Sequence, residues 1–452
     1  MSTSAHAPAR RSRLNLYTWI VTLGGFLFGY DTGIINGALP FLQQQFSLSP
    51  VAEGVTTSSL TLGAALGAMT VGQLVDRFGR RRVLFVLALV FIAGSTGIAF
   101  APTLPVLVAF RVVVGLAVGA ASAVVPLYLA EIAPPDQRGA IVTRNQFMIV
   151  TGQLLAYGMN AWLGNVFLHE PGIWRIMFAL SAIPALALFL GMFAVPESPR
   201  WLLLAGREAA ARRVLEKTSA DASAEYAHLH DSIEKERSTR AGTLRDLFAS
   251  KALRRILLIG AAIGIVQQIT GVNALMYYGT QVLRESGFAT DAALTANIAN
   301  GAISVIGAAI GIWFVGRLPR RLTLTVGLAG TTLSLLALAL ISTFVDGSAR
   351  AWFVLIISVI FLVFQQGAVS PVTWVLMSEV FPSRVRGAGM GAVTFVSWLA
   401  NFAVSFSFPQ IVAAFGLGIT FGIFAVLGVG AILFVRALVP ETAGRALEDI
   451  EA

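Results

Sequence analysis

Apolar segments of about 20 residues, each long enough to cross a hydrocarbon core of about 30 Å, recur along nearly the whole chain. Only 12% of the residues are charged, whereas soluble domains carry about 25%. A soluble core would bury one or two such segments, so the pattern predicts an all-α membrane protein with twelve transmembrane helices. We expect them near 16–39, 55–75, 83–101, 106–130, 140–165, 174–195, 255–282, 293–315, 322–345, 351–378, 387–412 and 416–438.

Charged landmarks beside these segments recur at a spacing of about half the chain. The repeats are Glu131 and Glu379 (248 positions apart), Arg138 and Arg386 (248), Glu197 and Glu441 (244), and the segments 76–81 and 316–321 (240). Repeats of this kind occur in carriers whose two similar halves rock about a central site. The repeats therefore predict two pseudo-symmetric six-helix halves.

The net charge of +9 does not indicate nucleic acid binding, because the basic residues do not form one face. They lie in alternate connections, with Arg284 and Arg350 as exceptions, while the connection 41–54 contains neither Lys nor Arg. This asymmetry predicts a multi-pass protein of a cell (inner) membrane with both termini in the cytoplasm. The expected parts are a tail (1–15), a first half (16–196), a charged helical linker (197–254), a second half (255–439) and a tail (440–452).

Enzymatic activity is not expected. None of the three lysines (217, 235 and 251) follows a glycine, so the chain contains no phosphate-binding GK motif. The four histidines are scattered and there is no cysteine. We expect no catalytic residue, no cofactor and no metal site.

Asp31 and Arg111 are charged residues inside predicted spans, where a charge costs at least about 2.5–3.5 kcal/mol. Asp31 lies about 15 residues into the first span, roughly 22 Å from the cytoplasmic face. Arg111 lies about five residues into the fourth span, which runs the other way, and therefore reaches about the same depth. An ion pair would lower the cost of both charges, and Asp31 could take up a proton. The alternatives are a static structural pair or an Arg111 that reaches outward.

Amide side chains gather on two predicted spans. Gln146, Gln153 and Asn160 share one face of the fifth span, and Gln267, Gln268 and Asn273 lie together on the seventh, followed by Tyr277 and Tyr278. Amides both donate and accept hydrogen bonds, which suits a neutral solute with many hydroxyl groups. Amides also hold helices together in lipid. We expect most of this group to bind solute.

Two tryptophans are further candidates for solute contact. Trp374 follows the interrupted sequence Gly367 to Pro371 on the tenth span, where a broken helix can line a cavity. Trp398 lies in the eleventh span. The alternative for a tryptophan at the end of a span is an anchor in the membrane interface.

The basic connections contain candidates for conformational control. They are Asp76, Arg77, Arg81, Glu131, Arg138, Glu197, Arg200, Arg317, Glu379, Arg386 and Glu441. Glu131 and Arg138, and likewise Glu379 and Arg386, are seven positions apart around a turn that contains proline. We expect salt bridges between helix ends that hold the inner side shut. For the arginine-rich segment 72–83, the alternative is a role in topology alone.

Taken together, these motifs resemble the sugar porters of the major facilitator superfamily, from about Leu16 to Ile450. The matching motifs are GYDTGIINGAL (29–39), GQLVDRFGRRR (72–82), YLAEIAPPDQRGA (128–140), PESPRWL (196–202), QQITGVNALMYYG (267–279), SEVFPSRVRGAG (378–389) and PETAGRALEDIE (440–451). The resemblance implies the major facilitator fold with cytoplasmic linker helices and alternating access. It also implies that Asp31 takes up the proton and pairs with Arg111, and that Gln146, Gln153, Gln267, Gln268, Asn273 and Trp374 contact the sugar.

Three departures from the family pattern affect the expected site. Ser304 stands where a site asparagine is common, and Ser397 where a Gln or Asn precedes the tryptophan. Gly316 and Pro319 replace the second-half Asp and Gly of the arginine-rich motif. The first two leave the identity of the sugar open, and the third alters the motif at the inner gate of the second half.

We therefore expect a proton-coupled symporter that imports a monosaccharide or polyol (a hexose, a pentose or inositol) and works as a monomer in the lipid bilayer. Inositol and hexoses rank above disaccharides. The alternatives are a passive uniporter, a drug/proton antiporter and a non-transporting sugar sensor.

Overall fold

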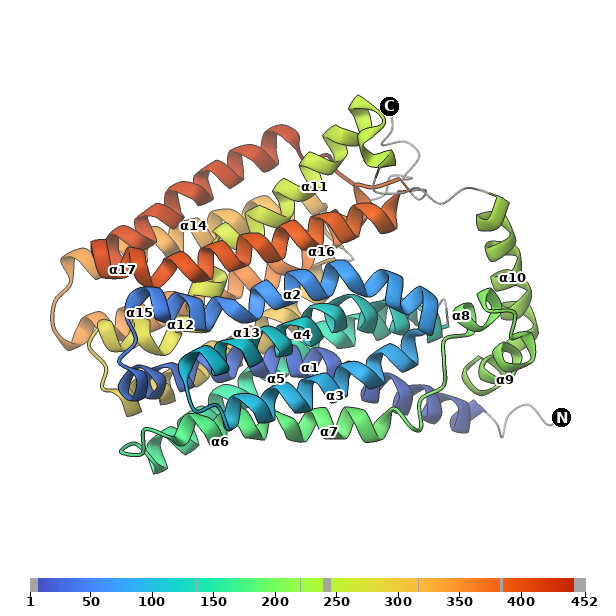
Figure 1. Cartoon of the computed structure of the whole chain (residues 1–452). Coiled ribbons are helices and arrows are strands. Elements are labelled where there is room, and N and C mark those ends of the chain that lie inside the picture. The colour runs from blue at the N-terminus through green and yellow to red at the C-terminus, as the bar shows by residue number, and fades with distance from the viewer. Residues whose placement is uncertain are drawn as a thin grey trace.

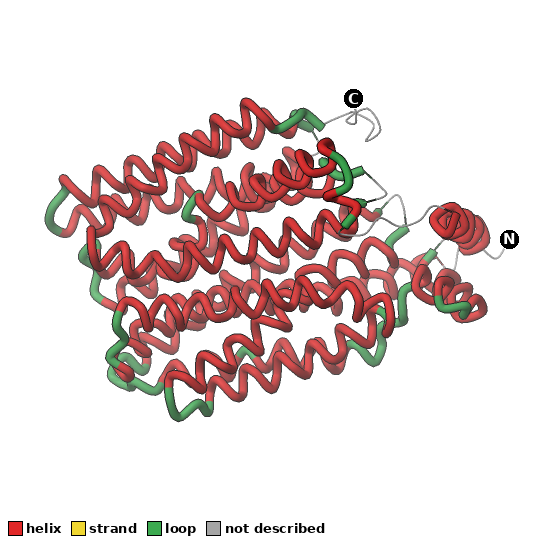
Figure 2. Tube along the Cα trace, turned by 45° about the horizontal axis from the view of Figure 1, so that its top comes forward, coloured by secondary structure: helices red, strands yellow, loops and turns green. Residues whose placement is uncertain are grey.

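The computed structural model describes residues 7–134, 137–219, 221–238, 245–315, 317–382 and 385–442. Within these ranges every regular element is a helix, and no strand occurs (Figure 2). Most of the predicted tail 440–452, part of the tail 1–15, two stretches of the linker and the motif position Gly316 lie outside the described residues.

The first half contains six crossings. They are α1 (Ala7–Phe46), α2 (Pro50–Phe78), α3 (Arg80–Ala99), α4 (Leu104–Ile132), α5 (Arg138–Val166), and α6 (Ile173–Leu180) with α7 (Ala182–Gly191). The sixth crossing is interrupted at Ser181 because Pro184 has no N–H to donate to the carbonyl of Leu180. Closely approaching glycines join α2 to α4, since a Cβ on Gly63 would meet the carbonyl of Val112 and one on Gly119 that of Ala64.

The second half repeats this arrangement with more interruptions. Its elements are α11 (Lys251–Ile269), α12 (Val272–Glu285), α13 (Thr290–Val315), α14 (Arg320–Phe344), α15 (Ser348–Phe364), the π-helical turn η2 (Gln365–Val369), α16 (Ser370–Glu379) and α17 (Arg386–Leu438). Gly271, with φ of 78°, separates α11 from α12 within one crossing. Gly416, with φ of 77°, separates two crossings inside α17. Glycine adopts this left-handed conformation without the steric cost that a Cβ brings.

Among the described residues, nine helical stretches are apolar and long enough to cross a membrane. Counting α17 as two crossings and adding α1 and α5 gives the twelve that the sequence predicts. These two helices are 40 and 29 residues long but fall short in mean hydropathy. Their interior polar residues, such as Asp31 and Gln153, lower it. The two most polar crossings therefore contain predicted site residues.

The helices between the halves are α8 (Pro199–Leu204), α9 (Glu208–Thr218), α10 (Ala222–Ser238) and the single 3-10 turn η1 (Asp246–Phe248). Helices α8 to α10 lie beside one end of the bundle, which we call the linker end (Figure 1). They share a small apolar core around Trp201 and Leu215. The indole nitrogen of Trp201 donates to the carbonyl of Asp76 at 3.0 Å and fastens α8 to the end of α2.

Among the described residues, three helix pairs make the most extensive contacts between the halves. Helix α2 packs on α17, α5 on α13, and α1 on α12. Because α1 and α5 also pack tightly on each other, the predicted amides of α5 and the acid of α1 lie between the halves rather than toward lipid.

Candidate functional site

Asp31 of α1 and Arg111 of α4 lie together inside the first half. The Oδ2 atom of Asp31 is 3.9 Å from Nη1 of Arg111, and each side chain is 1% exposed. The guanidinium also donates to the carbonyls of Thr56 (2.7 Å) and Thr57 (3.2 Å) on α2. Arg111 therefore points into the bundle, not outward, and ties α1 and α2 to α4.

The carboxylate of Asp31 has fewer bonds than its arginine partner. Neither of its oxygens accepts a hydrogen bond from a described residue. The ion pair at 3.9 Å is longer than a charge-assisted hydrogen bond of about 2.8 Å. Asp31 can therefore gain or lose a proton without breaking any hydrogen bond of its own.

The break between α11 and α12 brings amides from two helices together in the second half. The amide nitrogen of Gln268 donates to Ser397 Oγ of α17 at 2.9 Å, and Asn273 Nδ2 donates to Gln268 Oε1 at 2.5 Å. Gln267 is also buried, and its side-chain oxygen accepts no hydrogen bond from a described residue. The serine that departs from the family pattern is thus a partner of a predicted site amide.

The predicted amides of α5 differ in their surroundings. Gln153 is buried and donates to the sulfur of Met276 on α12 at 3.6 Å, across the boundary between the halves. Gln146 is half-buried. Asn160 donates to the carbonyls of Gly33 (2.8 Å) and Ile34 (3.3 Å) on α1. The amide of Asn160 therefore joins helices, which is the alternative role considered for this group.

The other predicted solute contacts have different surroundings. The hydroxyl of Tyr278 donates to the carbonyl of Ser405 at 2.7 Å, and that of Ser304 to the carbonyl of Asn300 at 2.7 Å. Both hydroxyls are thus occupied within the second half. Trp374 is half-buried beyond the π-helical turn. Trp398 is buried with its ring 5.5 Å from Phe28 of α1, and its N–H finds no acceptor among the described residues.

Asn36 and Tyr157 are contacts between the halves that the sequence reasoning missed. The amide nitrogen of Asn36 donates to the carbonyl of Met276 at 2.6 Å, and Tyr157 donates to the same carbonyl at 3.0 Å. Asn36 Oδ1 accepts from the backbone N–H (2.9 Å) and the hydroxyl (2.6 Å) of Thr280. The sequence signal that could have indicated Asn36 was an amide inside an apolar span, five residues after Asp31.

At the linker end the repeated residues build the same arrangement in both halves. In the first half, Arg80 Nη2 lies 2.8 Å from Glu131, and Glu197 accepts the backbone N–H groups of Arg80 (3.0 Å) and Arg81 (3.1 Å). In the second, Arg320 Nε lies 3.7 Å from Glu379, and Glu441 accepts the N–H groups of Arg320 (2.9 Å) and Arg321 (3.1 Å). Glu197 and Glu441 thus cap the starts of α3 and α14.

These bonds correct the expected pairing. Glu131 pairs with Arg80, while Arg138 at the start of α5 is exposed. Glu379 pairs with Arg320, while Arg386 donates to the carbonyl of Phe381 at 3.4 Å. Every one of these bonds lies within a single half. The reason is that the helix ends they join belong to neighbouring helices of that half.

The other predicted conformational residues surround these bonds. Asp76 is largely exposed at 3.8 Å from Arg80, and Arg77 is exposed beside the ring of Phe78. Arg81 donates to the carbonyl of Met192 at 3.1 Å. Arg200 is half-buried, and Arg317 is exposed over the ring of Trp313.

Two further polar contacts between described residues of the two halves lie at the end opposite the linker. Arg284 of α12 donates to Gln43 of α1 at 3.2 Å, and Asn165 of α5 donates to Thr295 of α13 at 3.0 Å. Together with the bonds of Asn36, they close this end of the boundary between the halves.

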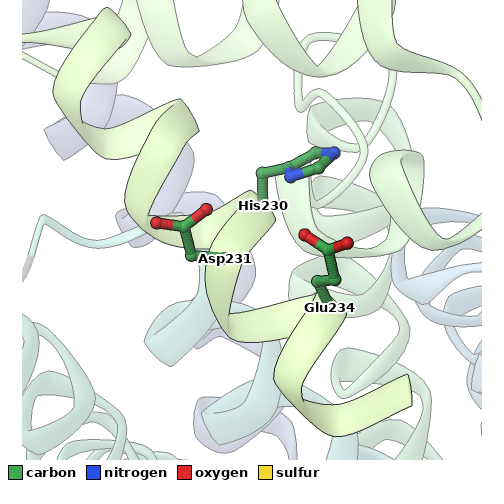
Figure 3. Close-up of side chains that lie close together, drawn as sticks. All are labelled: His230, Asp231 and Glu234. Carbon is green, nitrogen blue, oxygen red and sulfur yellow. The ribbon is translucent and has the colours of Figure 1, made fainter. Parts of the chain in front are cut away.

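One cluster of metal-ligand side-chain types occurs among the described residues, where the sequence predicts none. His230, Asp231 and Glu234 of α10 have ligand atoms within 4.8 Å of one another (Figure 3). All three are exposed, and His230 and Glu234 share one side of the helix. Exposed acidic groups are common without an ion.

Comparison with known proteins places this geometry in a family. The model of the family described as "Sugar (and other) transporter" matches residues 17–452. The chain is 50% identical over 447 residues to the putative metabolite transport protein YncC of Bacillus subtilis, covering 98% of this chain and 95% of that protein. It is also 50% identical over 437 residues to the major myo-inositol transporter IolT of the same organism, covering 96% and 92%.

Solved structures agree with the fold. The partially occluded inward-open conformation of the xylose transporter XylE from E. coli matches with a TM-score of 0.84 and 30% identity, covering 96% of this chain and all of that one. XylE bound to 6-bromo-6-deoxy-D-glucose, described as a proton:xylose symporter, matches with a TM-score of 0.81 and 32% identity, covering 98% and 99%. The protein has the major facilitator fold and is a transporter, not an enzyme. The chain belongs to the sugar porter family of the major facilitator superfamily and is a multi-pass sugar transporter of the membrane.

Proposed function

We propose that this sugar transporter is a proton-coupled symporter that imports a small neutral polyol or monosaccharide by alternating access. The observation that carries the proposal is the pair of Asp31 and Arg111, buried at 3.9 Å in the first half. A buried ion pair adds little to the stability of a fold, because the desolvation of the two charged groups offsets much of the attraction between them. A purely structural role therefore explains this pair poorly. An acid with no hydrogen bond to lose is suited to bind and release a proton.

The proposed substrate is a ring with several hydroxyl groups, with inositol and hexoses ranked first. Gln153, Gln267, Gln268 and Asn273 offer amides to such a solute, and Trp374 and Trp398 offer aromatic faces. Three of these amides are buried, and two have an oxygen with no donor from a described residue. The similarity to a protein named as a myo-inositol transporter supports inositol. The similarity to a proton:xylose symporter supports the coupling.

The proposed orientation puts the linker end, α8 to α10 and both termini in the cytoplasm, with the domain boundaries that the sequence predicts. The basic connections support it. In this orientation the polar contacts between the halves lie on the outer side, so the structure represents an inward-facing state. We propose that the monomer is the functional unit.

In the proposed cycle, a proton from outside neutralises Asp31 and weakens its hold on Arg111. Helix α1 is then free to shift relative to α4. Since α1 also carries Asn36, which bonds to α12, its movement is transmitted to the boundary between the halves. Sugar at the central amides favours closure of the outer side, and release of both ligands inside resets the pair.

Two uptake experiments test this proposal. Cells that express the protein are given radiolabelled inositol, glucose, galactose or xylose, and the external pH of a weakly buffered suspension is followed. A symporter alkalinises the medium when its substrate is added. Each inward proton contributes about 2.3 kcal/mol per 100 mV of membrane potential, which is about a 50-fold concentration ratio. Uptake without alkalinisation or accumulation would indicate a uniporter.

A further inference from the structure

Glu53 is a second buried acid, and neither the proton-coupling pair nor the amide site involves it. It lies in the first turn of α2, and its side chain is 4% exposed. Its Oε2 atom accepts a hydrogen bond from Gln43 of α1 at 2.8 Å, while Oε1 is buried and accepts none from a described residue. Helix α2 packs on α17 of the other half, and the boundary here is so close that a Cβ on neighbouring Gly54 would meet the carbonyl of Phe406. Glu53 is thus enclosed where the halves meet.

Gln43 connects Glu53 to the second half. Its amide oxygen accepts from Arg284 of α12 at 3.2 Å while its amide nitrogen donates to Glu53. The guanidinium of Arg284 is thus bonded to the amide, and no ion pair joins it to Glu53 among the described residues. Gln281 of α12 donates to Glu285 at 3.0 Å. The neutral amide of Gln43 therefore lies between the buried acid and the guanidinium of Arg284.

The other charged or titratable groups around Glu53 have partners of their own. Arg111 of α4 is bonded to the carbonyls one turn deeper in α2, and Tyr278 of α12 to Ser405. Arg350 of α15 donates to the carbonyl of Glu285 at 2.8 Å. From α17, the uncharged side chain of Gln410 lies beside neighbouring Gly54.

We propose that Glu53 is a proton-operated latch of the outer side, separate from the pair of Asp31 and Arg111. When the outer side is open, Glu53 faces external water. Closure buries it against the neutral amide of Gln43, and an ionised carboxylate is costly in such a place unless it is paired. A proton from external water, bound to one carboxylate oxygen, removes this cost, and the proton returns outside at the next opening. This inference uses the proposed orientation, and it does not require that sugar transport be proton-coupled.

The test measures the opening of the outer side directly. Because the chain contains no cysteine, nitroxide labels can be placed at His169→Cys, in the connection after α5, and at Ser348→Cys, at the start of α15. The distribution of distances between the two nitroxide labels is recorded in detergent without sugar between pH 5 and 9. The measurements use an Asp31→Asn background, so that the titration of Asp31 does not contribute. We expect the short-distance, closed population to increase as the pH falls.

Three variants in the same background decide the outcome. Glu53→Gln is expected to remove the pH-dependent transition and keep the closed population at all pH values. Glu53→Asp keeps a titrating carboxyl and is expected to retain a transition. Glu285→Gln, which removes the exposed carboxylate of the same cluster, leaves Glu53 in place and is expected to retain a pH-dependent transition. If Glu53→Gln shows the midpoint of its parent, or if only Glu285→Gln abolishes the transition, the proposal is overturned. Since Asp31 is absent throughout, failure here is distinguishable from failure of the symport proposal.

Discussion

Several residues that we assign to the proton and the solute have buried oxygens that accept no hydrogen bond from a described residue. These oxygens include both carboxylate oxygens of Asp31 and the amide oxygens of Gln153 and Gln267. A buried polar group without a partner costs about 1–3 kcal/mol. Such a cost is expected where a ligand satisfies the group in another state of the cycle. The amide of Asn160, by contrast, is bonded to the backbone of α1.

This contrast predicts different effects of two alanine substitutions. Asn273→Ala removes a donor to Gln268 and a proposed sugar contact, so we expect sugar affinity to fall about tenfold, as the loss of about 1.4 kcal/mol implies. Asn160→Ala removes an amide between α1 and α5, so we expect a lower unfolding temperature and unchanged affinity. Equilibrium sugar binding and thermal unfolding of the purified variants measure both. Weaker binding in Asn160→Ala alone would contradict the assignment.

At the residue scale, the sequence predicted the depth of buried charged residues better than it predicted which residues contact each other. Counting residues from the membrane faces placed Asp31 and Arg111 at one depth, and the structure puts them 3.9 Å apart. Neighbours that depend on the packing of two halves could not be found in this way. The bond from Asn36 to Met276 joins residues 240 positions apart. The sequence does not indicate that Glu53 is buried, because this residue lies at the edge of an apolar segment, where an exposed acid is common.

At the element scale, the repeat in the sequence becomes a repeated helix cap. Glu197 and Glu441 accept the first N–H groups of α3 and α14, where the positive end of a helix dipole favours an anion. The sequence showed the repeat but not which arginine each acid would contact. Any of the four arginines between 77 and 82 could contact these acids on the sequence alone. Only the path of the chain after α2 places Arg80 beside Glu131. Helix boundaries were easier to predict, because Gly, Pro and charged residues end the apolar segments.

The caps lead to a prediction about stability. Glu197→Gln replaces an anion at the start of α3 with a neutral amide, and we expect a loss of about 1 kcal/mol. The unfolding temperature should fall by about 2 °C. Intrinsic fluorescence during heating can report it, because the chain contains eight tryptophans. Glu441→Gln should behave alike, whereas Glu216→Gln, on an exposed face of α9, should leave the temperature unchanged. Equal effects of all three would contradict a specific role for the caps.

At the scale of the whole molecule, the polar bonds that the described residues make between the halves lie toward one end, opposite the linker. The salt bridges at the linker end, Arg80–Glu131 and Arg320–Glu379, each join helices of the same half. The sequence expectation that salt bridges hold the inner side shut stays a prediction. A sequence identifies charged residues that recur but not whether a bond lies within a half or between halves.

A disulfide across the closed end should therefore stop transport. Asn165 and Thr295 are hydrogen-bonded at 3.0 Å between α5 and α13. We expect the double variant Asn165→Cys and Thr295→Cys to form a cross-link under oxidation, to lose uptake and to regain it on reduction. Each single variant, in a chain without other cysteines, should keep its activity under oxidation. Undiminished uptake by the fully cross-linked protein would show that this end need not open.

The central claim is that Asp31, facing Arg111, couples protons to sugar, and accumulation by Asp31→Asn in proteoliposomes tests it most directly. The vesicles are given a proton gradient and a membrane potential, and the steady-state ratio of labelled sugar inside to outside is measured beside sugar exchange at equilibrium. We predict that the wild type accumulates sugar, whereas the variant exchanges it but reaches a ratio of about one, because a neutral side chain gains nothing from the voltage that acts on a proton. Accumulation by Asp31→Asn to the level of the wild type would contradict the account.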